Sequence, residues 1–406
     1  MSPRSAPVAT GWRTPLAIVL CGCLVGMLNF GPRSALGMFV TPISSAHGWG
    51  RDVLALALAI EMFVWGAALP VVGAIADRHG PVRVLIAGAV VYAVGLVWMA
   101  NATTPGALHL SAGLMVGLGL AGSSFTLVLG AFAKLLPPQW RSLAFGAGTA
   151  AGSFGQFLFS PLAAVLIGSV GWRHTLFVFA LLVLLIVPLA FVLRMPPEPA
   201  GGGRAQTLRS ALAEAFAHRS YVLLVLGFFT CGFQLFFITV HLPAYLVDRG
   251  LSAQVGAWTI GTIGLANIIG ALSVGWLGDR FPKPYLLAAI YALRAVAIAV
   301  FVLLPPSPGT AIAFGFVIGL LWLSSVPPTS SLVALMFGTR WFTTLFGFAF
   351  FSHQVGGFLG VWLGGVLFER TGSYDVVWWL SVALGIASAL INLPIVEKPV
   401  VRRATA

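Results

Sequence analysis

The chain has 406 residues, of which 59% are hydrophobic and only 8% are charged. A soluble protein of this length needs a far more charged surface, so a soluble globular fold is excluded and an all-α membrane protein is predicted. The net charge of +12 is spread over many short segments instead of forming a stripe, so it does not indicate a nucleic-acid partner.

Apolar runs of roughly 20 residues or more, the length that crosses a bilayer, occur twelve times along the chain. The first six runs form a domain over 1–194 and the last six form a domain over 220–406. Between the domains, 195–219 is a Pro- and Gly-rich linker that ends in the pattern of an amphipathic helix on the membrane surface. We expect transmembrane helices near 14–41, 52–75, 81–101, 106–134, 141–168, 173–194, 220–246, 253–277, 284–304, 309–336, 342–369 and 374–396.

Lysine and arginine are distributed unevenly among the segments that join these spans. With both termini in the cytoplasm, 16 of the 22 basic residues lie on the cytoplasmic side, four lie outside and two lie within spans. Cytoplasmic loops of membrane proteins carry such an excess. We therefore predict a multi-pass protein of the inner (plasma) membrane, in contact with lipid, with both termini and the linker in the cytoplasm.

A short polar loop, GAIADRHGPVRVL, joins the second and third predicted spans and returns in part between the eighth and ninth. The two copies are separated by 202 positions, about half of the chain, so the chain consists of two related halves. Further pairs at this offset, or at 201 after a slip of one residue, are Gly48 with Gly250, Trp140 with Trp341, Phe145 with Phe346, Gly146 with Gly347 and Gly171 with Gly372. The loop residues that we single out are Gly73, Asp77, Arg78, Gly80 and Arg83 in the first copy and Asp279 and Arg280 in the second.

This loop pattern resembles the signature loop of the major facilitator superfamily. The resemblance implies two parallel repeats of six helices, with a substrate site between them that opens to each side in turn. The loop departs from the family pattern at Pro81 and Val82, which replace basic residues, and at Pro282, which replaces a glycine. Because the Asp and the first Arg are present in both copies, we expect the loop to control the balance between conformations.

Two looser cues resemble bacterial relatives of the oxalate/formate antiporters and the monocarboxylate transporters: the segment 31–51 and the sequence CGFQLFFITVHLPAYL at 231–246. This resemblance implies a secondary active transporter of a small organic anion. The arginine that the monocarboxylate branch has in span 8 falls near Ala271 here, and the antiporter's lysine in span 11 is absent. Arg33 would therefore have to supply the positive charge. The alternative within the superfamily is a drug or metabolite exporter, although the Gly-Pro-rich motif of such exporters is missing from span 5.

Three charged residues lie deep within the predicted spans: Arg33, Glu61 and Arg294. Each costs about 3 kcal/mol at the centre of a membrane, so such residues face a cavity or a partner. Two interpretations of Arg33 remain open, a planar fork for a substrate carboxylate and an ion pair with Glu61. Arg294 is in span 9, which is peripheral in the resembled family, so we assign it to packing or gating.

Uncharged polar residues near the middle of the spans provide further candidates. We expect the substrate to be bound by Arg33, Asn29, Gln234, His353 and Gln354. The candidates for proton coupling are Glu61, His353 and His241, although a lone histidine in a membrane is more often a hydrogen-bonded contact between helices.

The sequence contains no nucleophile–base pair, metal-ligand cluster or phosphate loop, and Cys21, Cys23 and Cys231 all lie within apolar runs. We therefore expect no catalytic residue, metal or cofactor, and a membrane-embedded enzyme is the least favoured function. The expected partners are a small-molecule substrate, a proton and membrane lipid, and the expected state is a monomer.

Overall fold

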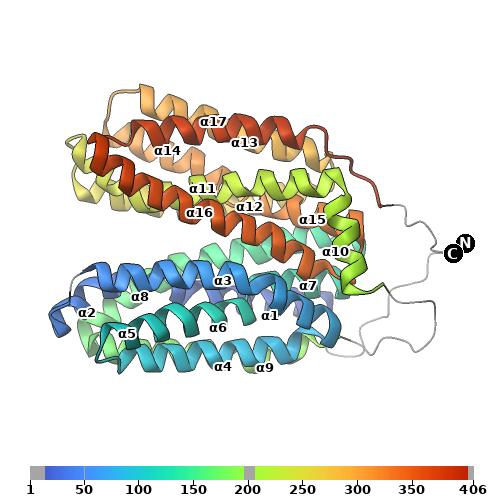
Figure 1. Cartoon of the computed structure of the whole chain (residues 1–406), viewed down its shortest axis with the longest axis horizontal. Coiled ribbons are helices and arrows are strands. Elements are labelled where there is room, and N and C mark those ends of the chain that lie inside the picture. Colours follow the sequence, from blue (N-terminus) through green and yellow to red (C-terminus); the bar gives the residue numbers. More distant parts are fainter. Residues whose placement is uncertain (1–13, 50, 196–205, 401–406) are drawn as a thin grey trace, which may run out of the picture.

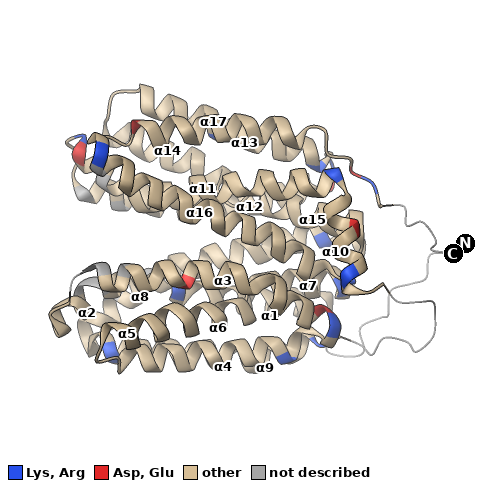
Figure 2. Cartoon of the chain, in the orientation of Figure 1, with Lys and Arg blue, Asp and Glu red and all other residues tan. Residues whose placement is uncertain are grey.

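The computed structural model describes residues 14–49, 51–195 and 206–400, and over these ranges it contains helices and no strand. The helices form two bundles side by side, α1 to α9 in one and α11 to α17 in the other, with α10 across one end (Figure 1). We refer to the end that carries α10 as the linker end. Charged residues gather toward the ends of the bundles, and few lie between them (Figure 2).

The first bundle contains the first six predicted spans. Its elements are α1 (Pro15–Ala35), η1 (Leu36–Phe39), α2 (Val40–His47), α3 (Arg51–His79), α4 (Pro81–Ala100), α5 (Pro105–Leu108), the π-helical η2 (His109–Met115), α6 (Val116–Gly122), α7 (Phe125–Leu135), α8 (Pro138–Leu184), α9 (Ile186–Ala190) and η3 (Phe191–Leu193).

The second bundle follows the linker helix α10 (Leu208–Ala217). Part of the predicted linker, 196–205, lies outside the described residues, as do both termini, 1–13 and 401–406. The elements of the second bundle are α11 (Arg219–Asp248), α12 (Ala253–Leu277), α13 (Lys283–Leu303), α14 (Pro308–Leu321), α15 (Val326–Phe337), α16 (Phe342–Thr371) and α17 (Asp375–Asn392).

Helix α8 covers the predicted span 141–168 and, because it folds back on itself at Gly171, also the first half of the span 173–194, which α9 and η3 complete. The backbone angles there, φ 81° and ψ 163°, are accessible to glycine and costly for other residues. The rings of Phe159 and Phe179, on either side of the turn, have centroids 5.4 Å apart. Eleven segments of the described chain are long and apolar enough to cross a membrane, and the first arm of α8 supplies the remaining predicted span at 141–168.

Two glycine pairs of the repeat have a positive φ at both positions. Gly48 and Gly250 have φ values of 68° and 84°, and Gly171 and Gly372 have values of 81° and 68°. Each pair occupies equivalent positions in the two halves, so the repeat places a positive φ at the same two points of each half, while ψ differs between Gly171 (163°) and Gly372 (10°).

Two predicted spans are interrupted, which we did not expect from the sequence. The span at 106–134 breaks at Ser123–Ser124, between α6 and α7, and the span at 309–336 breaks at 322–325, between α14 and α15. The second break contains Ser324 and Ser325, which lie 201 positions after the first serine pair. The two breaks are therefore equivalent in the repeat.

Proline explains the second break. Pro327 and Pro328 lie in the first turn of α15 and have no N–H to donate to the carbonyl groups at the end of α14. Proline also disfavours a helical backbone in the residue before it. The expectation of one continuous helix over 309–336 was wrong because it considered hydropathy and not these two residues.

Close helix packing depends on glycine where α12 crosses α14. A Cβ atom added to Gly270 would overlap the carbonyl oxygen of Leu320, whereas Gly264 on the same helix faces open space. We expect Gly270→Ala to lower the free energy of unfolding by about 1–3 kcal/mol, because the helices would have to move apart. Gly264→Ala should preserve or raise it, since alanine favours helix more than glycine does. The melting temperatures of the purified variants test this, and equal values would contradict the close approach.

Candidate functional site

A cavity of about 80 Å³ lies between the two bundles and is lined by residues from both. Its lining includes four pairs of positions that the repeat makes equivalent: Arg33 with Leu235, Phe125 with Val326, Thr149 with Phe350 and Gly152 with His353. The cavity therefore lies on the axis that relates the two halves. This is where the resemblance to the superfamily places a substrate.

Arg33 and Glu61 form an ion pair at the wall of this cavity. The Nε atom of Arg33 lies 3.2 Å from Oε1 of Glu61, and their side chains are 15% and 1% exposed. Among the residues that the structure describes, neither terminal nitrogen of Arg33 has a hydrogen-bond partner. The two interpretations of Arg33 are therefore compatible: one edge of the guanidinium binds Glu61, and the other edge can donate to a second carboxylate.

Aromatic rings surround the guanidinium. Its Cζ atom is 5.9 Å from the ring centroids of both Phe30 and Trp65, and 5.8 Å from that of Phe236. Phe236 belongs to α11, so one of these rings comes from the opposite bundle. Arginine is attracted to aromatic faces, and this attraction strengthens when water is excluded. The rings thus hold Arg33 in place without using its hydrogen-bond donors.

His353 and Gln354 lie on the α16 wall of the cavity. Nδ1 of His353 is 3.2 Å from Oε1 of Gln354, and Nε2 of Gln354 donates to the carbonyl oxygen of Met62 at 3.4 Å. The latter contact joins α16 to α3 across the two bundles. Within the described part of the chain, Nε2 of His353 has no partner. The structure therefore brings Arg33, His353 and Gln354 to one cavity, as the sequence predicted.

The structure does not bring Asn29, Gln234 and His241 into the cavity lining. Asn29 donates to Ser123 Oγ at 2.9 Å, Gln234 donates to the Ser381 carbonyl oxygen at 2.9 Å, and His241 Nε2 lies 2.9 Å from the Val361 carbonyl oxygen. All three connect helices within their own bundle. In this structure the three side chains join helices, and substrate binding by Asn29 and Gln234 and proton coupling by His241 stay predictions.

Arg294 caps the end of α14 at the second break. Its Nε atom donates to the Leu321 carbonyl oxygen at 2.9 Å, and Nη2 donates to the carbonyl oxygens of Leu321 and Trp322. The last carbonyls of a helix have no partner within the helix, and the membrane interior has no water to supply one. Arg294 is absent from the cavity lining. This placement favours packing over substrate binding.

Asn267 also binds a backbone group that the second break leaves without a helical partner. We did not select Asn267 from the sequence as a site residue. Its Oδ1 atom accepts the backbone N–H of Leu323 at 2.9 Å, and its Nδ2 donates to Ser153 of the first bundle. The second break is thus tied to both halves. Interpreting Pro327 and Pro328 as a helix boundary could have revealed the second break from the sequence.

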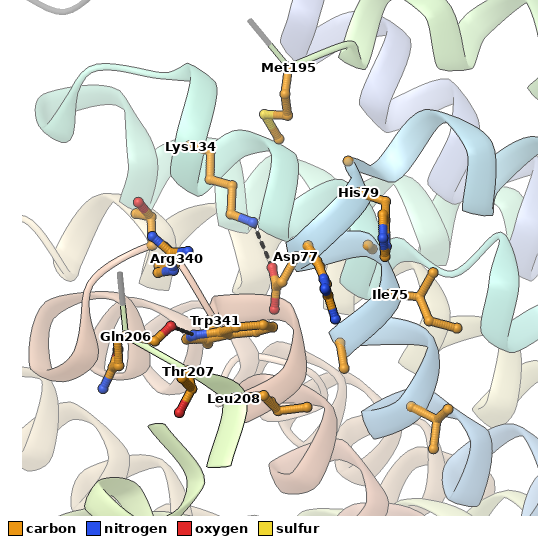
Figure 3. A pocket seen from close by; sticks show the side chains of 16 residues that line it. Ile75, Asp77, His79, Lys134, Met195, Gln206, Thr207, Leu208, Arg340 and Trp341 are labelled. Atoms are coloured by element: carbon orange, nitrogen blue, oxygen red, sulfur yellow. Dashed lines mark hydrogen bonds and ion pairs between the residues drawn. The ribbon is translucent and has the colours of Figure 1, made fainter. Parts of the chain in front are cut away.

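At the linker end, Asp77 bridges the bundles. Its Oδ1 atom accepts from Lys134 Nζ at 2.6 Å (Figure 3), and its Oδ2 accepts from the backbone N–H of Thr344 at 2.7 Å and from its hydroxyl at 2.9 Å. Thr344 lies in the first turn of α16, where unpaired N–H groups and the helix dipole favour a negative charge. A carboxylate on α3 therefore caps a helix of the other bundle.

The rest of the first loop supports this bridge. Gly73 allows close approach to Thr343, since a Cβ atom there would lie 2.8 Å from its carbonyl carbon. Gly80 turns the chain with a φ of 84°, and Arg78 and Arg83 are exposed.

The second copy of the loop is different. Asp279 and Arg280 are exposed, and Arg280 lies over the ring of Trp276 at 3.6 Å. The bundles are joined on this side by Ser142, whose hydroxyl donates to the carbonyl oxygen of Gly275 at 2.6 Å. The structure thus gives the two loop copies unequal roles.

A larger pocket, of about 980 Å³, surrounds the Asp77 bridge and is lined partly by the linker. Figure 3 shows Trp341 donating from Nε1 to the carbonyl oxygen of Gln206, at 3.1 Å. The segment before α10 therefore lies against the start of α16. The described chain holds no group of three or more His, Cys, Asp and Glu side chains that could bind a metal.

Comparison with known proteins agrees with this arrangement. Residues 22–361 match the description of the Major Facilitator Superfamily. The chain belongs to this superfamily. The resemblance predicted from the sequence is confirmed, and this transporter has relatives along nearly its whole length.

Relatives of this chain include proteins named as monocarboxylate transporters. Monocarboxylate transporter 13 of Rattus norvegicus is 29% identical, over 97% of this chain and 92% of its own length. Monocarboxylate transporter 11 of Homo sapiens is 26% identical, over 97% and 85%. A bacterial relative, the MFS-type transporter YcxA of Bacillus subtilis, is 26% identical over 92% and 93%.

Solved structures share the fold. The E. coli fucose:proton symporter FucP superimposes with a TM-score of 0.72 at 16% identity, covering 94% of this chain and 99% of its own. The proton:xylose symporter XylE gives a TM-score of 0.70 at 15% identity, covering 93% and 94%. At this identity the likeness shows the fold alone, and it confirms the predicted all-α membrane architecture.

We expect Asp77→Asn to weaken the closure of the linker end, because the amide loses the ion pair with Lys134 and caps α16 less well. The loss of about 1 kcal/mol would raise the open population roughly fivefold. The measurement is the rate at which a maleimide labels a cysteine at Ala271, a buried position of α12 that lies against α8 of the first bundle, in a protein without its native cysteines.

Asp279→Asn is the matched control, since Asp279 is the equivalent residue of the second loop and is exposed. It should leave the labelling rate unchanged. If Asp77→Asn labels no faster than Asp279→Asn, the bridge does not hold the linker end closed.

Proposed function

We propose that this transporter carries a small monocarboxylate across the inner membrane by alternating access, in symport with a proton. The observation that carries the proposal is Arg33, a guanidinium on the wall of the cavity between the halves with its terminal nitrogens unused. Arginine can bind a carboxylate through two parallel hydrogen bonds. The names of the two mammalian relatives agree with a monocarboxylate.

The charge of the cavity favours a single carboxylate. Arg33 is the one Lys or Arg among the described residues that line it. Glu61 already neutralises part of the charge of Arg33. The position of the second half that is equivalent to Arg33 is Leu235, which has no charge. A second carboxylate on the substrate would lose its water without gaining a cation, which is costly in a largely apolar site. This argues against dicarboxylates such as oxalate.

The ion pair suggests how a proton is coupled to the substrate. Oε2 of Glu61 is buried and has no partner within the described chain, so Arg33 alone compensates its charge. When a substrate carboxylate binds the free edge of the guanidinium, it shares the positive charge that compensates Glu61, so the charge on Glu61 is less well compensated and proton uptake is favoured. Anion and proton would then bind together. The names of FucP and XylE describe proton symporters, which is compatible with this scheme.

The Asp77 bridge supports the alternating-access part of the proposal. The linker end is closed by contacts of Asp77 and Ser142 with the opposite bundle, so a substrate would reach the cavity from the other end in this state. The excess of lysine and arginine supports a cytoplasmic position for the linker end. Breaking these contacts would open the cavity to the cytoplasm.

We expect Arg33→Lys to weaken monocarboxylate binding by about 1.5–3 kcal/mol, because lysine keeps the charge and loses the planar fork. The shift of melting temperature with added carboxylate measures the binding. Arg173→Gln, at an exposed arginine, is the control and should bind as wild type does. Normal anion binding by a folded Arg33→Gln protein would show that Arg33 is structural.

We expect Glu61→Gln to abolish uphill uptake driven by a proton gradient and to retain exchange of substrate, because the amide cannot take up a proton. Uptake into proteoliposomes with and without the gradient measures both activities. His353→Gln is compared in the same assay, since His353 is the second candidate for the proton. Retention of gradient-driven uptake in Glu61→Gln and its loss in His353→Gln would reassign the proton to His353, and wild-type uptake without gradient dependence would exclude symport.

A further inference from the structure

We infer that the cavity selects monocarboxylates with a hydrocarbon tail over 2-hydroxy acids of the same size, and that the rings around Arg33 set this selection. The inference rests on the proposed function, because it assumes that the substrate carboxylate binds Arg33. It concerns the part of the substrate next to the carboxylate.

The first observation is the composition of the wall beside the guanidinium. The ring centroids of Phe30, Trp65 and Phe236 all lie within 5.9 Å of Cζ of Arg33. The enclosure continues beyond them, since the ring of Phe350 lies 5.2 Å from that of Trp65 and 5.6 Å from that of Phe125. A group bonded to the carbon next to the carboxylate would therefore meet ring atoms.

The second observation is that the hydroxyls in the lining are already used. Thr149 donates to the Phe145 carbonyl oxygen and Thr239 to the Leu235 carbonyl oxygen, both at 2.8 Å and within their own helices. The amide of Gln354 is shared between His353 and Met62, and Gln156 also has a partner. The hydrogens of these two hydroxyls are therefore taken, so a substrate hydroxyl can donate to their oxygens but can accept a hydrogen bond from neither.

The third observation concerns the polar atoms that have no partner. Nε1 of Trp65, Oε2 of Glu61 and Nε2 of His353 are unpaired within the described residues, but each atom is itself buried. Neighbouring atoms cover them, so a hydroxyl in the cavity cannot reach them without moving the wall.

These observations together predict the sign of the preference. A 2-hydroxyl group loses its water on entering the cavity and recovers only part of its hydrogen bonding there, and such burial is unfavourable. A methyl group of similar size at the same place gains contact with the rings. An apolar pocket rejects an isostere that adds a hydroxyl by about 100-fold.

Isobutyrate and lactate form a matched pair, because lactate has a hydroxyl where isobutyrate has a methyl group. The experiment measures the concentration of each that gives half-maximal thermal stabilisation of the purified protein, with isobutyramide as the uncharged analogue. We expect isobutyrate to bind at least about tenfold more tightly than lactate.

The outcomes separate this inference from the function on which it rests. A ratio below about tenfold, with both carboxylates binding better than isobutyramide, overturns the tail preference and leaves the proposed function intact. If neither carboxylate binds better than isobutyramide, carboxylate recognition fails, and the tail preference fails with it.

A variant tests whether the rings are responsible. Phe236→Tyr adds one hydroxyl beside Arg33 and should reduce the ratio, because the new group can bond to lactate. Phe358→Tyr, at a residue of α16 that is 44% exposed, is the control and should keep the wild-type ratio. An unchanged ratio in Phe236→Tyr overturns the role of this ring. Phe30→Tyr replaces it in the test if the melting temperature shows that Phe236→Tyr does not fold.

Discussion

The membrane interior offers no water to a backbone group that has lost its helical partner, and this constraint determines how the polar residues of the spans are used. Each interrupted span needs side chains to satisfy the groups that the break releases. Beside the first break, Asn29 donates to the carbonyl oxygen of Leu120. At the second break, Arg294 donates to the carbonyl oxygen of Leu321, and Asn267 accepts from the backbone N–H of Leu323. Arg33 differs from them because its donors are not consumed by a break. That difference is what makes Arg33 available to a ligand.

Most of the fold could be predicted from the sequence, because the length and hydropathy of a span are properties of a continuous segment. The repeat, the Arg33–Glu61 contact and the meeting of Arg33 with His353 and Gln354 follow from such segments and from their depth in the membrane. The breaks could not be predicted in this way: serine, which marks the first, is tolerated inside membrane helices, and Pro327 and Pro328, which mark the second, do not alter the length or hydropathy of the span. The role of Arg294 was equally hidden, since it depends on carbonyl groups released by a break 27 positions away.

The two halves share a backbone plan and differ at the positions that bear chemistry. Arg33 is matched by Leu235, His353 by Gly152, and the bridging Asp77 by the exposed Asp279. A fully symmetric cavity would place two guanidinium groups on one axis, where they would repel each other. The differences between the repeats therefore create a site with one charged wall, while the common backbone keeps that wall on the axis that relates the two halves.

The turn at Gly171 has a consequence for biosynthesis. It joins two arms of α8 without an intervening loop, so the arms must enter the bilayer together as a hairpin. The second arm belongs to the most apolar of the candidate spans, whereas the first arm contains Gly, Ser, Thr and Gln and is not counted among them on its own. The second arm can thus provide the driving force for inserting the first. A chain released from the ribosome before the second arm emerges would leave the first arm without this help, and one wall of the cavity would be missing.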